Sequence, residues 1–112
     1  MEMGQRIVDG IPVVSVSGRI DGVTSIDLEV VLDGLIDKKI KMMIVDFSEV
    51  EYISSAGLRV LIAALKKLRA MEGDLVLISL RPFVREVFEM TGFTKLFVIC
   101  SDVGEAMERF RS

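Results

Sequence analysis

Short apolar runs alternate along this chain with segments whose apolar residues recur at helical spacing, and this alternation limits the fold more than any other feature. The runs "KMMIVDF" and "DLVLIS" are short and almost continuously apolar, which is typical of strands buried on both faces. The segments between such runs place leucine, valine and isoleucine three and four residues apart, as in helices that bury one face. Strands that alternate with helices favour parallel crossovers, so the pattern predicts an α/β domain.

The first elements are predicted to be a hairpin and a helix. The runs "QRIVDG" and "IPVVSVSG" are rich in β-branched residues and meet at Asp9-Gly10, a dipeptide that favours a tight turn. From Thr24 onward the apolar period becomes helical, and Thr24 or Ser25 is predicted to cap this helix. A buried strand, "KMMIVDF", follows this helix.

The second half of the chain repeats this pattern. The helix after the third strand is predicted to end before Gly73, and Pro82 opens a short helix at its favoured first position. The run "KLFVIC" is predicted to be the last strand, and Asp102 and Glu105 have capping-box spacing before a final helix. The chain is therefore predicted to be a single α/β domain, with a mixed, mostly parallel sheet packed against about four helices.

Composition argues against several functions. With no histidine and one cysteine, Cys100, the chain is not expected to hold an internal disulfide, a metal site or a histidine-based triad. A net charge of -3, no tryptophan and one tyrosine argue against nucleic-acid binding. The longest apolar run, residues 60–65, is far shorter than the roughly 20 residues of a spanning helix, and "MEMGQR" lacks signal-peptide features. We therefore expect a soluble, cytoplasmic protein that does not bind membranes.

Two polar segments follow predicted parallel strands, at the edge where function gathers in such sheets: residues 17–25 and residues 46–57. The second contains the adjacent Ser54 and Ser55 at the predicted start of a helix, where several backbone N–H groups lack partners. One interpretation is that one of these serines is an N-cap. The other is that a serine accepts a phosphate at the helix start, with Ala56 and Gly57 leaving room for an approaching enzyme.

The segment "VDFSEVEYISSAGLRVL", residues 45–61, closely resembles the signature of STAS domains, in particular the small bacterial anti-sigma factor antagonists. In addition, "VSGRIDGVTS" resembles the family's G-x-(L/I)-D-x-x-T loop, and "RPFVREVFEMTGF" resembles its later P-x-V-x-x-x-F-x-x-x-G helix. The three motifs occur in the family's order and together cover nearly the whole chain. The resemblance implies that residues 1–112 form one STAS domain.

The resemblance also implies a phosphorylation switch. The family's phosphoserine maps onto Ser55, and Ser54, which stands where many members have aspartate, is the alternative site. In the family, the unphosphorylated protein binds an anti-sigma factor that is also a serine kinase, and the sigma factor is released. Phosphorylation frees the kinase, and a PP2C-type phosphatase resets the cycle. Such a protein is not an enzyme and needs no cofactor of its own.

Further residues near the serines complete the predicted site. Asp21 is expected either to contact the kinase or its nucleotide, as the resemblance suggests, or to form a turn, since it is followed by glycine. Arg59, on the outer face of the second helix, either meets a partner or is a solvated surface charge. Asp46 is expected to form a structural Asx turn. The predicted partner- or nucleotide-binding residues are Asp21, Thr24, Ser54, Ser55, Gly57 and Arg59.

The residues also allow two other functions. A non-phosphorylated STAS adaptor, or a module that senses and weakly binds a nucleotide, fits the same fold. A serine hydrolase with Ser55 as nucleophile lacks a histidine base and the G-x-S-x-G elbow, so it requires an unusual Ser-Lys arrangement. The chain also has no P-loop or G-x-G-x-x-G fingerprint, so ATP and magnesium for phosphorylation would come from the partner kinase.

Overall fold

A computed structural model describes residues 1–111, which form one five-stranded sheet, four α-helices and one 3-10 helix. The order of strands and α-helices is the predicted one. The elements are β1 Glu2–Val8, β2 Ile11–Ile20, α1 Thr24–Asp37, β3 Met42–Ile53, α2 Ser55–Ala70, β4 Asp74–Ile78, α3 Pro82–Met90, η1 Phe93–Lys95, β5 Val98–Cys100 and α4 Val103–Arg111.

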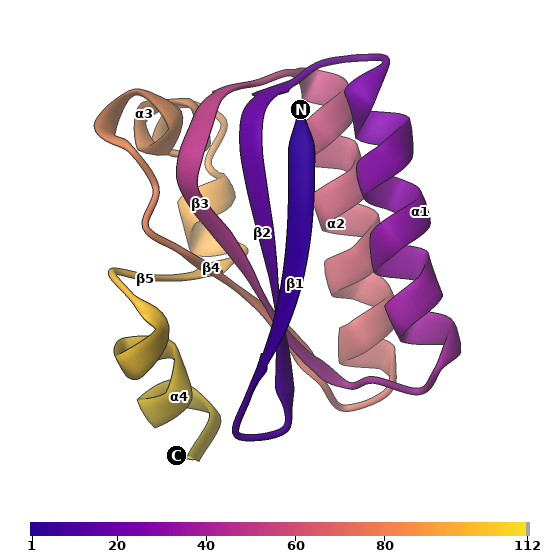
Figure 1. The fold of residues 1–112 in the computed structure, drawn as a ribbon. Helices are drawn as coiled ribbons and strands as arrows, with labels where there is room; N and C mark the ends of the chain where they lie inside the picture. The colour runs from indigo at the N-terminus through magenta and orange to yellow at the C-terminus, as the bar shows by residue number, and fades with distance from the viewer. Residues whose placement is uncertain (112) are drawn as a thin grey trace.

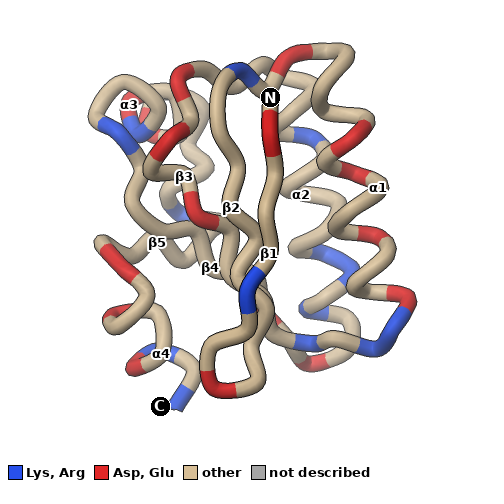
Figure 2. Tube along the Cα trace, in the orientation of Figure 1, with Lys and Arg blue, Asp and Glu red and all other residues tan. Residues whose placement is uncertain are grey.

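The sheet is mixed and mostly parallel, as predicted. Its strands lie in the order β1-β2-β3-β4-β5, and only the β1–β2 pair is antiparallel. α1 and α2 lie side by side against one face of the sheet, and α4 lies on the other (Figure 1). Lysine and arginine segments are scattered among acidic ones over the fold (Figure 2). Within the described residues, no helix is both long and apolar enough to cross a membrane.

The predicted hairpin is confirmed. Asp9 and Gly10 have φ angles of 49° and 81°, which match the twist that a two-residue hairpin turn requires. Pro12 lies opposite Ile7 at the start of β2, before the pairing of β2 with β3 begins at Val13. Its missing N–H therefore removes no bond from the β2–β3 ladder.

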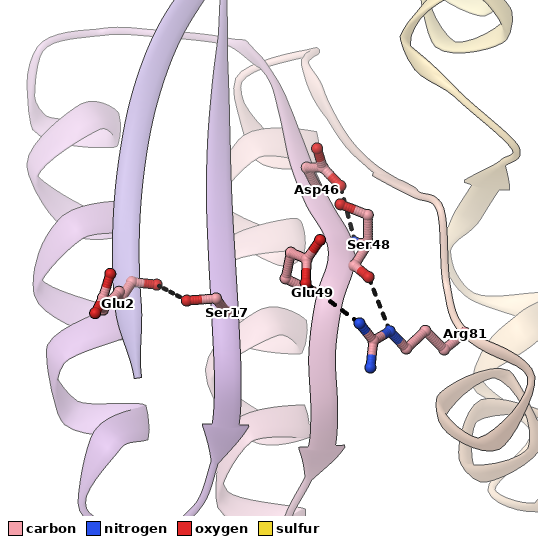
Figure 3. Close-up of polar contacts among 6 residues, drawn as sticks. All are labelled: Glu2, Ser17, Asp46, Ser48, Glu49 and Arg81. Atoms are coloured by element: carbon pink, nitrogen blue, oxygen red, sulfur yellow. Dashed lines mark hydrogen bonds and ion pairs between the residues drawn. The ribbon is translucent and has the colours of Figure 1, made fainter.

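β3 is longer than predicted. The sequence indicated a loop over residues 46–57, but the strand continues to Ile53 and pairs with β2 as far as Ile20. A bulge lies after Asp46, whose carboxylate accepts a hydrogen bond from the Ser48 N–H at 2.9 Å (Figure 3). The Asx turn predicted at Asp46 is confirmed, although it lies inside a strand. A second register shift, between Val50 and Tyr52, adds another residue to β3, so the buried side chains of this half follow a spacing of three: Phe47, Val50 and Ile53.

α3 packs beside the second half of β3, where β4 has already ended. The Phe88 ring meets Phe47 edge-on, with ring centroids 6.2 Å apart. Arg81, just before α3, donates from Nε to the Ser48 carbonyl at 2.9 Å and from its terminal nitrogen to Glu49 at 3.3 Å (Figure 3). Arg81 thereby satisfies a backbone acceptor that no strand reaches.

The last strand is shorter than predicted. Of "KLFVIC", only Val98–Cys100 form β5, because Gly92, with a φ of 79°, turns the chain into the short helix η1. Phe97 then enters the core, with its ring 5.7 Å from that of Phe88. Cys100 is buried, and burial raises the pKa of its thiol.

Only half of the predicted capping box forms at α4. The Asp102 carboxylate accepts from the Glu105 N–H at 2.9 Å, as a cap should. The Glu105 carboxylate accepts from the Ser101 hydroxyl at 2.8 Å, whereas a full box requires it to bond the backbone of Asp102.

Candidate functional site

The starts of α1 and α2 lie next to each other at the carboxyl edge of the sheet (Figure 1). Ile20 and Ile53 are partners at the ends of β2 and β3, and the Ser54 N–H donates to the Ile20 carbonyl at 2.8 Å. Each strand leads almost directly into its helix. This edge therefore brings together all the predicted site residues: Asp21, Thr24, Ser54, Ser55, Gly57 and Arg59.

Ser54 is the N-cap of α2, which confirms that one of the two serines is a cap. Its backbone is extended, with φ -89° and ψ 171°, and its hydroxyl oxygen accepts from the Gly57 N–H at 3.2 Å. The side chain is half-buried. Its hydrogen-bonding capacity is thus used to close the first turn of the helix.

Ser55, the next residue, has a different environment. It is the first residue of α2 and its side chain is exposed. Within residues 1–111, its hydroxyl makes no hydrogen bond. The hydroxyl therefore lies free at a helix N-terminus, where unpaired N–H groups and the helix dipole favour a negative charge.

Gly57 does not leave room for a partner, so that part of the prediction is wrong. The residue is buried, and a Cβ at this position would lie 2.7 Å from Ile20 Cγ2 and 2.9 Å from Ile53 Cγ1. Its missing side chain lets α2 approach the ends of β2 and β3. Sequence alone does not show which side of a helix such a glycine faces.

The prediction that Thr24 or Ser25 caps α1 is wrong: Val23 stands at the N-cap without a side-chain cap bond, and the carboxylate of Asp21, two residues earlier, caps the helix start instead. The Asp21 carboxylate accepts from the N–H groups of Val23 and Thr24, both at 2.9 Å. Thr24 is instead the first helical residue, and its hydroxyl accepts from the Asp21 N–H and donates to the Arg19 carbonyl, both at 2.8 Å. Ser25 is buried. With β2 extended to Ile20, the loop is short enough for Asp21 to reach the helix start.

These bonds set the charge of Asp21. The N–H of Thr24 first, and that of Val23 second, hold the pKa of the Asp21 carboxyl below its ordinary value of 3.8. The carboxylate is ionised at neutral pH, and its oxygen is already engaged by the helix. The Asp21 carboxylate therefore has fewer free positions for hydrogen bonds from a nucleotide or a kinase than the sequence indicated.

A hollow of about 330 Å³ lies between the first halves of α1 and α2. It was not predicted from the sequence. Nearby apolar side chains of the α1 region face solvent: Val23, Ile26 and Val30 are 60% to 75% exposed. Their spacing forms a second apolar stripe, out of phase with the buried Leu28 and Leu32, and this signal was available in the sequence. The hollow is lined by Ser25, Ile26, Glu29, Ala56, Arg59, Val60 and Ala63.

This edge of the sheet presents an exposed hydroxyl, Ser55, and an exposed guanidinium, Arg59, next to the hollow. Arg59 is exposed beside the hollow, as predicted for the outer face of α2. Within residues 1–111, no base is hydrogen-bonded to the Ser55 hydroxyl, so the activation that a serine nucleophile requires is not built. The same residues contain no group of three or more side chains arranged to hold a metal ion.

Known proteins resemble this chain over nearly all its length. The STAS domain family model matches residues 4–106. BtrV of Bordetella bronchiseptica is 35% identical over 112 residues, covering 100% of this chain and 97% of that protein. The Anti-sigma-B factor antagonist of Listeria monocytogenes is 32% identical over 105 residues, covering 94% and 91%. The crystal structure of an anti-sigma factor antagonist from Mycobacterium paratuberculosis superposes with a TM-score of 0.90 at 30% identity, covering 99% and 94%.

Proposed function

This chain belongs to the STAS domain family, and on that premise we propose that it is an anti-sigma factor antagonist switched by phosphorylation at Ser55. The unphosphorylated protein binds an anti-sigma factor that is also a serine kinase, which releases the sigma factor. Phosphorylation of Ser55 ends this binding. The regulatory class is supported by the Listeria relative, which is named an anti-sigma-B factor antagonist.

The observation that carries this proposal is the division of roles between Ser54 and Ser55. The Ser54 hydroxyl is half-buried and holds the Gly57 N–H, so a kinase would have to open the helix start to reach it. The Ser55 hydroxyl is exposed and makes no hydrogen bond within residues 1–111. Ser55 is therefore the acceptor for a phosphoryl group, and Ser54 keeps the helix capped before and after the reaction.

A phosphate at Ser55 acts on the interface and leaves the fold intact. At a helix N-terminus the added charge of about -1.5 to -2 meets a favourable dipole, so α2 keeps its structure. A partner that covers Ser55 must bury this charge, and an uncompensated buried charge costs several kcal/mol. Since each 1.4 kcal/mol changes affinity about tenfold, the partner is released without any conformational change here.

The surface that the anti-sigma factor covers extends from Ser55 over the hollow between α1 and α2. Arg59 supplies a charge there, and Ile26 supplies an exposed apolar side chain 60% accessible to solvent. An exposed apolar patch bordered by charges is typical of a protein interaction site. The kinase brings ATP and magnesium, and a PP2C-type phosphatase removes the phosphate, so the chain itself supplies no cofactor.

Affinity capture from the native cell lysate tests this proposal. The baits are the wild type, Ser55→Ala and Ser55→Asp, with Arg109→Gln as a control that lowers the net charge by the same one unit at an exposed residue of α4. We expect an ATP-binding serine kinase on the wild type, Ser55→Ala and Arg109→Gln baits, and its loss from Ser55→Asp. The same proteins on every bait would contradict the switch and leave a non-phosphorylated adaptor as the function.

A further inference from the structure

β1 is a long strand at an open edge of the sheet. It has seven residues paired with β2 without any register shift, and no helix crosses its outer side (Figure 1). The opposite edge strand, β5, has only three residues. Proteins protect edge strands with prolines, bulges or short length, and β1, Glu2–Val8, has none of these devices.

The hairpin turn determines which peptide groups β1 presents outward. Val8 and Ile11 flank the two-residue turn and form its closing hydrogen-bonded pair, so every second residue from Val8 bonds to β2. The N–H and C=O groups of Met3, Gln5 and Ile7 therefore point away from β2. They form a row of free donors and acceptors to which another strand can pair.

Two charges on β1 are placed symmetrically about Gly4. Glu2 and Arg6 lie two residues to either side of Gly4 and on the same face of the strand, and both are exposed. They stand about 13 Å apart along the strand, too far to pair within one chain. Figure 2 shows this acidic and this basic segment along β1, and Figure 3 shows the Glu2 carboxylate turned away from Ser17, on the outer side of the strand.

We propose that two copies of this chain associate through β1 in an antiparallel pair centred on Gly4. In this register Met3 exchanges main-chain hydrogen bonds with Gln5 of the second copy, consistent with the outward direction of both residues. Glu2 lies opposite Arg6 of the second copy, and the two-fold symmetry repeats this ion pair on the other side of Gly4. The result is one continuous ten-stranded sheet formed by two five-stranded sheets.

The side chains on the opposite face of β1 are also consistent with this register. Ile7 is 66% exposed in the single chain, which is unusual for a large aliphatic side chain in a sheet. In the Gly4-centred pair it lies opposite Met1 of the second copy, and Met1 is partly buried against the main core. The pairing thus covers an exposed apolar residue on one face and joins opposite charges on the other.

Disulfide trapping tests the register directly. Gly4→Cys is tolerated because a Cβ at this position meets nothing within 4 Å, and the two cysteines would face each other at a Cα separation of about 4.5 Å. Gln5→Cys is the matched control, because two residues 5 are diagonal in this register and about 7 Å or more apart. Under mild oxidation we expect Gly4→Cys to give mainly covalent dimer and Gln5→Cys mainly monomer, while the buried Cys100 stays reduced.

Charge reversal tests the same pair in solution without a covalent bond. Sedimentation velocity over a concentration series at low salt should show a monomer–dimer equilibrium, with the dimer Kd raised about tenfold or more in Glu2→Arg and in Arg6→Glu. The double variant restores opposite charges and should return to the wild-type Kd. Glu86→Arg, which reverses an exposed charge on α3, should leave the Kd unchanged.

Three results would overturn the proposal. The first is a single monomeric species up to about 1 mM wild-type protein. The second is cross-linking of Gln5→Cys as fast as, or faster than, Gly4→Cys. The third is a double charge variant as weak as the single variants.

Discussion

The starts of α1 and α2 lie side by side, yet they satisfy their helix ends in different ways. At α1, one Asp21 carboxylate oxygen accepts from the Thr24 N–H, and the Thr24 hydroxyl accepts from the Asp21 N–H and donates to the Arg19 carbonyl, so both side chains are engaged by the fold. At α2, Ser54 alone makes the side-chain cap, and Ser55 keeps an exposed hydroxyl. Cap-type residues at two neighbouring helix starts therefore have different environments, and Ser55 is the one among them whose hydroxyl makes no hydrogen bond within residues 1–111.

The two helices also differ in their glycines. Gly57, in the first turn of α2, is pressed against Ile20 and Ile53, whereas a Cβ at Gly34 in α1 would meet nothing within 4 Å. The close contact positions the start of α2 on the sheet and so fixes where Ser55 stands.

Gly57→Ala should destabilise the protein by about 1–3 kcal/mol, because its Cβ would lie 2.7 Å from Ile20 Cγ2 and the core must shift. Gly34→Ala is the control, and it should stabilise α1 by about 0.5–1 kcal/mol, since it gains helix propensity without a clash. Urea unfolding monitored by circular dichroism measures both. Equal effects of the two substitutions would show that α2 does not depend on this close approach.

Asp21→Ala should lower the melting temperature more than Ser54→Ala does, because two N–H groups and the Thr24 hydroxyl lose an acceptor together. The difference from wild type should depend on pH. Because the folded-state pKa of Asp21 lies below 3.8, its contribution is present above that value and is lost as pH falls through the folded pKa. Melting curves at pH 7 and at pH 3 or lower measure this.

Asp27→Ala is the control, since Asp27 is an exposed acid in the first turn of α1 whose side chain makes no hydrogen bond within residues 1–111. It should lower the melting temperature less than Asp21→Ala at neutral pH. A pH-independent gap between wild type and Asp21→Ala would contradict the role of the ionised cap.

Ser54→Ala should cost about 1 kcal/mol, the usual effect of removing an N-cap. Ser54→Asp should retain wild-type stability, because aspartate accepts the Gly57 N–H equally well and adds a favourable charge at the helix start. Thermal unfolding of the two variants distinguishes them. If Ser54→Ala were as stable as wild type, the cap would be unimportant and the division of roles between the serines would fail.

Ser55→Ala should change stability by less than about 0.5 kcal/mol, since its hydroxyl is exposed and makes no hydrogen bond within residues 1–111. We expect the substitution to affect regulation alone: the variant stays bound to the anti-sigma factor, which is also the kinase, when ATP is present. An unfolding curve of Ser55→Ala measures the effect on stability, and a binding curve with the anti-sigma factor measures the effect on regulation. A large loss of stability would make Ser55 a structural residue.

The sequence predicted the fold better than the site. Continuous apolar runs and helical periods indicated the buried strands and the α-helices, because these patterns report burial directly, whereas the mostly exposed β1 was indicated by its β-branched residues and the Asp9-Gly10 turn. The second half of β3 was missed because two register shifts, one after Asp46 and one after Val50, space the buried Phe47, Val50 and Ile53 by three residues, which is not the period of two that marks a strand.

The site details could not be predicted for a different reason. Asp21, Thr24 and Ser25 are all good cap residues, and only the length of the loop decides which of them reaches the free N–H groups of α1. Ser54 and Ser55 are chemically identical neighbours, so a one-residue shift of the helix start would exchange their roles. The resemblance implied Ser55 as the acceptor, with Ser54 as the alternative, and the exposed hydroxyl of Ser55 supports that choice.

The most direct measurement is site-resolved tandem mass spectrometry of the chain after reaction with its captured kinase and magnesium ATP. Wild type and Ser54→Asp should carry one phosphate, on Ser55, and Ser55→Ala should carry none. Phosphate on Ser54 in the wild type, or unchanged phosphorylation of Ser55→Ala, would contradict the division of roles between the two serines.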